Sequence, residues 1–127
     1  MINKQNEEYS TEELVNAIIE GIHKKKGKDP VNLDLTKIDN TFCSHFIVCH
    51  GDSNTQVEAI ADSVEETVRE TLGIKAWHKE GLANATWVLL DYAEVIVHIF
   101  QSEYRSFYNL EDLWADASLT RYEDVLK

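Results

Sequence analysis

Two short apolar runs in the last third of the chain predict the centre of the fold. Segments 86–91 and 95–100 are rich in β-branched and aromatic residues, and a polar break at 91–94 separates them. This pattern is typical of neighbouring strands joined by a tight reversal. Because side chains alternate along a strand, Trp87 shares a face with Asp91. Both faces of each run are largely apolar, which predicts central strands covered at least in part on both sides.

A helix is predicted near the N-terminus. Apolar residues recur at helical spacing from Leu14 to Ile22 and form one stripe. Ser10 and Glu13 precede this stripe with the spacing of a capping box, in which each side chain bonds the backbone N–H of the other residue. Gly27 is expected to end the helix, because glycine readily adopts the left-handed conformation that commonly follows a last helical turn.

A longer amphipathic helix is predicted in the middle of the chain. Its apolar stripe runs from Val57 to Leu72, and acidic residues cover the opposite surface. Ser53 and Gln56 have the spacing of a second capping box. Gly73 is expected to end this helix.

Three further strands are predicted from short apolar or alternating runs between turn residues. They span 31–35, 42–49 and 74–79. The link between the first two is short, so we expect them to run antiparallel. The resulting order is helix, two strands, helix, three strands, helix. This order predicts an α/β fold with a mixed, roughly five-stranded sheet and flanking helices.

The length of 127 residues suits one domain. Residues 1–9 are expected to form a flexible N-terminal arm and residues 10–116 the domain. After the last strand, Ser102 can cap a short helix, and a further helical turn is expected at 110–114. Residues 117–127 are expected to be a loosely held C-terminal tail, because periodicity is weak there.

The chain is strongly acidic, with 12 Lys and Arg against 23 Asp and Glu, and its net charge is −11. Phosphate repels such a surface, so we expect little direct binding of nucleic acid and a basic protein partner instead. The first 13 residues do not have the pattern of a signal peptide, and no apolar run approaches the ~20 residues of a membrane span. A cytoplasmic protein with reduced Cys43 and Cys49 is therefore expected.

A zinc site is the first chemical possibility, because Cys43, His45 and Cys49 share one face of a predicted strand. Along an extended strand, however, the two cysteines lie about 20 Å apart, and both cannot reach one tetrahedral ion. We therefore expect no metal and interpret the cysteines as small core residues.

A nucleotidyltransferase-like enzyme is the second possibility. Gly51 and Ser53 lie between a strand and a helix start, where free backbone amides can bind phosphate. Asp52 between them would repel phosphate, and Asp91 lacks the second carboxylate that would hold magnesium with it. The sequence is therefore distantly nucleotidyltransferase-like in layout only, and no enzyme activity is expected.

The chain strongly resembles the ribosomal silencing factor family, also called the Iojap family, over roughly residues 14–114. Any one of the matching motifs would be weak evidence, whereas their combination is specific. The motifs are Gly51 with Ser53, 57–61 in the long helix, Glu80-Gly81, Trp87 to Tyr92, Val95 to Phe100 and Arg105 to Trp114.

The resemblance implies a protein without catalytic activity or cofactor. Members bind the large ribosomal subunit through its universal protein number fourteen, cover a surface needed by the small subunit, and so repress translation. They often form homodimers, and organellar relatives act in ribosome assembly. A generic acidic adaptor or dimerisation module remains the alternative, because the charge and the predicted fold by themselves fit that function equally well.

We expect the partner-binding residues to form one patch where the central strand pair and its turn meet the following helix. Aromatic residues would exclude water there, and carboxylates would meet Lys or Arg of the ribosomal protein. The family usually has Gly then Asp where this chain has Ala93 and Glu94. If that turn requires a positive φ, Ala93 costs about 1 kcal/mol. The expected patch is Trp87, Asp91, Tyr92, Glu94, Arg105 and Tyr108.

Overall fold

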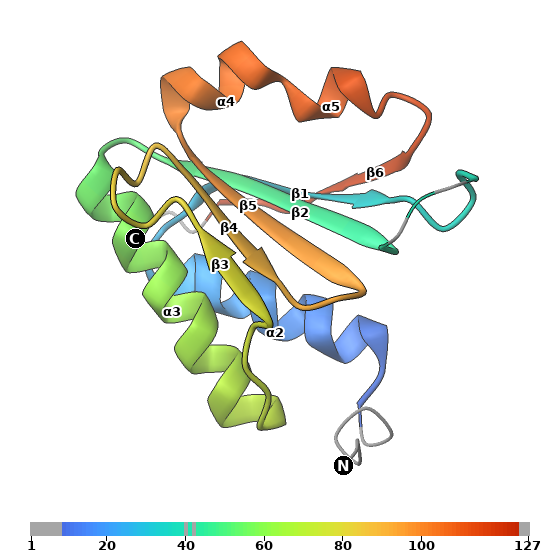
Figure 1. The fold of residues 1–127 in the computed structure, drawn as a ribbon, viewed down its shortest axis with the longest axis horizontal. Helices are drawn as coiled ribbons and strands as arrows, with labels where there is room; N and C mark the ends of the chain where they lie inside the picture. Colours follow the sequence, from blue (N-terminus) through green and yellow to red (C-terminus); the bar gives the residue numbers. More distant parts are fainter. Residues whose placement is uncertain (1–8, 40, 42, 125–127) are drawn as a thin grey trace.

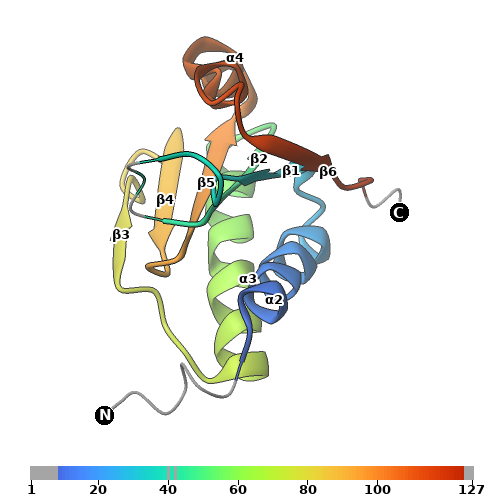
Figure 2. The same ribbon diagram turned by 90° about the vertical axis from the view of Figure 1, so that its right-hand side faces the viewer.

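The computed structural model describes residues 9–39, 41 and 43–124. Its centre is a six-stranded mixed sheet in the order β3-β4-β5-β2-β1-β6. Helices α2 and α3 cover one face of the sheet, and α4 and α5 lie over the other (Figures 1 and 2). The helices are α2 (Thr11–Lys24), α3 (Asn54–Leu72), α4 (Ser102–Tyr108) and α5 (Leu110–Leu113). The strands are β1 (Lys28–Asp34), β2 (His45–Gly51), β3 (His78–Glu80), β4 (Trp87–Asp91), β5 (Val95–Gln101) and β6 (Ser118–Arg121).

The sheet has one parallel pair at its centre, where β2 lies beside β5. The other neighbouring strands run antiparallel, including β1 with β2 and β4 with β5. The mixed α/β fold and the antiparallel β1–β2 pair predicted from the sequence are therefore confirmed. Every residue of β5 except its last is buried, as expected for a strand covered on both faces.

Helix α2 begins with the predicted capping box. The Ser10 hydroxyl accepts the Glu13 N–H at 3.1 Å, and the Glu13 carboxylate accepts the Ser10 N–H at 2.8 Å. The predicted role of Gly27 at the helix end is wrong, since the left-handed residue is Lys26, with φ 59°. A Cβ atom at Gly27 would lie 2.5 Å from Cγ2 of Ile22. Glycine is therefore needed there for space.

Helix α3 begins and ends where the sequence predicts. The Ser53 hydroxyl accepts the Gln56 N–H at 3.1 Å, and Gly73 follows the helix with φ 75°. The second half of the predicted capping box differs, because the Gln56 side chain accepts the N–H of Asp52 instead of Ser53. Its amide also donates to the carbonyl of Lys26, which ties the start of α3 to the end of α2.

The strand boundaries differ from the predictions at several points. Strand β2 spans 45–51 instead of 42–49, and Phe42 lies outside the described residues. Strand β3 is confined to 78–80, and β1 begins at Lys28. The predicted loose tail is wrong for 118–121, because these residues form β6 on the outer edge of β1. Of the predicted N-terminal arm, the structure describes Tyr9 alone.

Two separate clusters of buried side chains fill the two sides of the sheet. On the first side, α2 and α3 pack closely because Gly21 has no side chain. A Cβ atom there would lie 2.7 Å from the Cα atom of Val64. The Ser63 hydroxyl donates to the Gly21 carbonyl at 2.7 Å across the same contact. The second side contains most of the aromatic rings and positions the candidate site.

Candidate functional site

A group of aromatic rings covers the sheet beside α4. The Trp87 ring on β4 lies 4.9 Å from the Phe100 ring on β5 and 4.6 Å from the Tyr108 ring on α4, measured between centroids. Phe107 contacts Tyr108 edge-to-face at 5.1 Å. The sequence alternation places Trp87 and Phe100 on the same face of the antiparallel pair, where they are directly opposite.

His98 fixes the orientation of the Trp87 ring through a hydrogen bond. The indole N–H of Trp87 donates to Nδ1 of His98 at 3.1 Å. Because an indole only donates, Nδ1 must be the unprotonated nitrogen of a neutral ring. Burial lowers the pKa of His98 to about 4, so the ring stays neutral across the physiological range. We call Trp87, His98, Phe100, Phe107 and Tyr108 the aromatic face.

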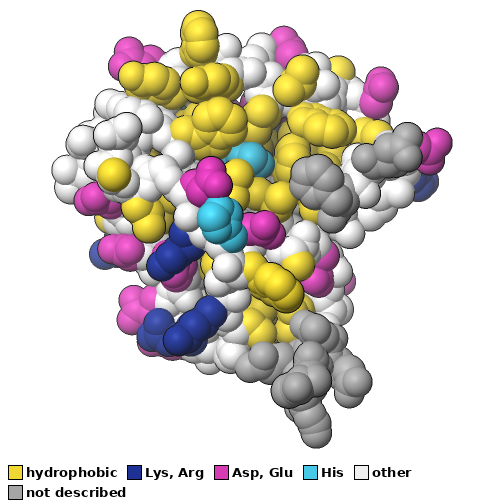
Figure 3. All heavy atoms as spheres, viewed as in Figure 1, with side chains coloured by type: hydrophobic (Ala, Val, Ile, Leu, Met, Phe, Trp, Pro, Cys, Tyr) yellow, Lys and Arg dark blue, Asp and Glu magenta, His cyan; other side chains and the backbone are white. Residues whose placement is uncertain are grey.

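The aromatic face continues outward into exposed apolar side chains on α4 and α5. Phe107 is 77% exposed, Leu113 72% and Tyr108 44%. Figure 3 shows apolar side chains gathered over this half of the molecule, with acidic side chains at the margin. In the segment 101–120 the only Lys or Arg is Arg105, which is buried. Exposed rings with an acidic margin are suited to contact a basic protein surface.

The β4–β5 turn contains Asp91, Tyr92, Ala93 and Glu94 at the opposite end of β4. Ala93 has φ 75°, so the positive φ considered from the sequence is present. The Asp91 carboxylate accepts the Ala93 N–H at 2.7 Å and stabilises this conformation. The Glu94 carboxylate accepts from the Thr11 hydroxyl at 3.3 Å, which joins the turn to the start of α2.

A hollow of about 640 Å³ lies beside this turn. Its lining residues include Asp91 and Glu94 together with Thr36, Thr41 and Ser44. The two carboxylates give the hollow an acidic character, and it is open to solvent. Both residues are half-buried.

Tyr92 is a core residue. Its side chain turns toward α2 and α3 and is only 3% exposed. Burial raises the pKa of its hydroxyl well above the usual value, with the nearby Glu65 carboxylate as a second cause. The expectation that Tyr92 anchors a partner at the surface is wrong for this structure, because the alternation that exposes Trp87 points residue 92 to the other face.

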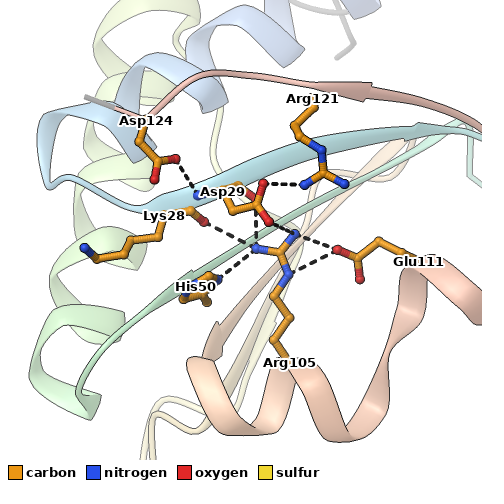
Figure 4. Close-up of polar contacts among 7 residues, drawn as sticks. All are labelled: Lys28, Asp29, His50, Arg105, Glu111, Arg121 and Asp124. Carbon is orange, nitrogen blue, oxygen red and sulfur yellow. Dashed lines mark hydrogen bonds and ion pairs between the residues drawn. The ribbon is translucent and has the colours of Figure 1, made fainter. Parts of the chain in front are cut away.

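Arg105 is also buried, and it joins α4 to β1 and α5. Its side chain is 8% exposed. Nε and Nη2 donate to one oxygen of Glu111 at 3.1 and 2.6 Å, and Nη1 donates to the Asp29 carbonyl at 2.8 Å (Figure 4). Nη1 also donates to Nδ1 of His50 on β2 at 2.9 Å. A buried charge with this many partners holds a segment in place.

The six predicted contact residues therefore do not form a single patch. Trp87 and Tyr108 meet on the aromatic face, whereas Asp91 and Glu94 lie about 13 Å along β4 from Trp87, at the turn. Arg105 and Tyr92 point inward from different elements. Sequence reasoning missed Phe107, Leu113 and the 84% exposed Trp77. Phe107 could have been found, because it is apolar and lies on a short helix whose first turn is acidic.

Three backbone amides at the strand-to-helix junction of Gly51 and Ser53 are already bonded within the protein. The N–H groups of Asp52 and Gln56 are bonded to the side chains of Gln56 and Ser53, and the Val57 N–H is bonded to the Ser53 carbonyl. Over residues 9–39, 41 and 43–124, no group of three or more His, Cys, Asp or Glu side chains is placed to hold a metal ion. Burial raises the pKa of the Cys49 thiol to about 12, which leaves it protonated and unreactive.

Comparisons with known proteins all point to one family. The family model described as "Ribosomal silencing factor during starvation" matches residues 8–127. The chain belongs to this ribosomal silencing factor family. It is 37% identical over 117 residues to "Ribosomal silencing factor RsfS" of Halalkalibacterium halodurans, covering 92% of this chain and 98% of the relative. It is 42% identical over 95 residues to the Bacillus subtilis protein of the same name, covering 75% and 79%.

A crystal structure from Chromobacterium violaceum has the same fold, with a TM-score of 0.79 and 36% identity over 84% of this chain and 88% of that one. The family is named for regulating ribosomes and not for a catalysed reaction. In the part of the chain that the structure describes, no helix is both long and apolar enough to cross a membrane.

Proposed function

We propose that this protein binds the large ribosomal subunit through its universal protein number fourteen and blocks joining of the small subunit. Translation is thereby repressed. Family membership supports an action on ribosomes, and the resemblance described above supplies the partner. The proposal places this action in the cytoplasm and includes a homodimer of the chain, as the resemblance to the family implies.

The aromatic face is the observation that carries this proposal. It offers exposed rings, a rigid Trp87 held by His98, and an acidic margin, in a chain with net charge −11. Aromatic residues are frequent energetic anchors in protein interfaces, and opposite charge speeds the approach of a basic partner. The absence of any free Lys or Arg in 101–120 disfavours bare RNA as the primary ligand.

The six sequence-predicted residues take different roles in this proposal. Trp87 and Tyr108 form the anchor, and Asp91 with Glu94 forms a second, charged contact at the turn. Arg105 and Tyr92 act from inside by holding α4 and the β4–β5 turn in position. Enzymatic turnover has no part in the proposal.

Co-sedimentation with isolated ribosomal subunits tests the proposal. We expect the protein to sediment with large subunits and not with small ones, and to lower the fraction of joined ribosomes when both subunits are mixed. Binding should weaken as salt is raised, because the charged part of the contact is screened. Equal binding to both subunits, or binding to neither, would contradict it.

A further inference from the structure

His50 lies where a single proton would alter how α4 is held. The residue is half-buried on β2, next to the point where Arg105 enters from α4. Arg105 cannot accept a hydrogen bond, so Nδ1 of His50 must be the acceptor in their 2.9 Å contact. The structure therefore requires a neutral His50 ring with its proton on Nε2.

A proton on Nδ1 would remove this acceptor. It would also place an imidazolium cation against the guanidinium of Arg105, whose side chain is only 8% exposed and poorly screened. Arg105 is the main polar link between α4 and the β1–β2 strands, through His50 and the carbonyls of Lys28 and Asp29. Repulsion between these like charges therefore weakens the docking of α4 on the sheet.

The surrounding charges do not cancel this repulsion. Glu111 of α5 is committed to Arg105, and Asp29 of β1 pairs with Arg121 of β6 as well as with Arg105 (Figure 4). Asp124 accepts the Asp29 N–H, and Asp52 is paired with Lys28. Burial and Arg105 lower the pKa of His50 below its usual value, and they outweigh Asp29, Asp52 and Asp124, which act in the opposite direction.

We propose that His50 is a proton-sensitive latch: a proton on its Nδ1 breaks the bond from Arg105 and loosens the α4–α5 segment from the sheet. Tyr108 of α4 forms part of the aromatic face, so loosening this segment disperses that surface. The effect on ribosome binding rests on the function proposed above, whereas the effect on α4 does not.

The direction of the pH dependence follows from the lowered pKa. Above the ordinary histidine pKa of about 6.5, His50 is neutral in both the docked and the loosened state, and docking is at full strength. As the pH falls below about 6.5, the loosened state gains a proton more readily than the docked state. At pH 5.5 the docking equilibrium can fall by at most about tenfold through this one group.

Proton NMR of the whole chain between pH 7.5 and 5.0 tests the latch without any mutation. We expect His50 to titrate with a midpoint below 6.5, and the Tyr108 and Phe107 ring signals to shift with the same midpoint. Amide protection factors, corrected for intrinsic exchange, should fall by up to about tenfold in α4 and α5 at pH 5.5 and stay constant in α2 and α3. A His50 titration that leaves the α4 signals and protection unchanged would overturn the proposal.

His50→Asn provides the matched variant, because the asparagine oxygen stands two bonds from Cβ, as Nδ1 does, and accepts a hydrogen bond without titrating. It should remove the pH dependence of α4 protection. His45→Asn is the control, since His45 lies on the same strand but bonds Asn32 at the other end, and its pH response in α4 should match wild type. Loss of protection in acid that is equal in His50→Asn and wild type would also overturn the latch.

Large-subunit binding measured at the same two pH values separates this proposal from the proposed function. Weaker binding at pH 5.5 for wild type, but not for His50→Asn, supports both. Binding to large subunits at neither pH, together with the expected NMR response, refutes the proposed function and retains the latch. Binding that does not change with pH while α4 protection falls would refute the link between the latch and the ribosome.

Discussion

On one face of the sheet, α2 and α3 bury mainly aliphatic side chains, whereas on the other, α4 and α5 pack against a mixture of aliphatic side chains and aromatic rings, and Arg105 of α4 reaches β1 and β2. The first contact is held by burial, as in Ile18 and Ile60, which are both 0% exposed. The second also buries apolar side chains, but it adds directional contacts such as Trp87 to His98 and Arg105 to Glu111. Burial has no preferred direction, whereas hydrogen bonds and ion pairs fix orientation and respond to charge.

This difference separates stability from recognition in the molecule. The α2–α3 side gains most of its free energy from removing apolar surface from water, and it leaves few rings for a partner. The α4–α5 side keeps Phe107 and Leu113 exposed, which costs stability and is understandable if another surface covers them. Mutations on the α2–α3 side should therefore change mainly the stability of the protein, and mutations on the α4–α5 side mainly its binding to a partner.

The largest effect is expected for Ile18→Ala on the α2–α3 side. Removing a fully buried isoleucine should lower the free energy of unfolding by about 2–5 kcal/mol, measured by urea denaturation. The matched variant Phe107→Ala, on the exposed side, should change it by no more than about 0.5 kcal/mol. Similar losses of stability in both variants would remove the contrast between the two faces.

Tyr108→Ala should act on binding. Loss of an interface ring typically costs 2 kcal/mol or more, so affinity for large subunits should fall by roughly 30-fold, measured by quantitative co-sedimentation. Leu119→Ala is the control, since Leu119 is exposed to a similar degree, 42% against 44%, but lies on β6. If both variants bind equally well, the aromatic face is not the contact surface.

A smaller effect of opposite sign is expected for Tyr92→Phe. The Tyr92 hydroxyl is buried and finds no hydrogen-bond partner among the residues that the structure describes. An unpaired buried hydroxyl costs about 1–3 kcal/mol, so its removal should raise the free energy of unfolding by about 1 kcal/mol. Affinity for large subunits should not change. A loss of affinity with unaltered stability would return Tyr92 to the contact surface.

The elements that the sequence predicts well are those whose periodicity reports burial. Helices α2 and α3 and strands β4 and β5 have strong apolar patterns and clear caps, and the structure places them close to the predicted positions. Strand β6 has no such pattern, because all four of its side chains are exposed. It forms through backbone pairing with β1, and pairing of that kind leaves no signal in side-chain hydrophobicity.

The sequence predicts contacts within the candidate site only where consecutive elements of the chain are also neighbours in space. Trp87 and Tyr108 meet because β5 leads directly into α4, so short-range order suffices. Arg105 donates to two carbonyls of β1, which lie 76 and 77 positions away in the sequence. No local sequence pattern reveals that its charge is paired inside the protein. The same reasoning failed for Tyr92, because the alternation along β4 that points Trp87 to one face points Tyr92 to the other, toward α2 and α3.

Strand β6 also sets the order in which the molecule can be completed during its synthesis. Residues 118–121 are made after the other strands of the sheet, yet they pair with residues 31–34 on the first strand. A nascent chain that ends before residue 118 leaves the outer edge of β1 with unpaired backbone groups, which invite pairing with other chains. A chain truncated before residue 118 should therefore aggregate more readily than one that includes β6.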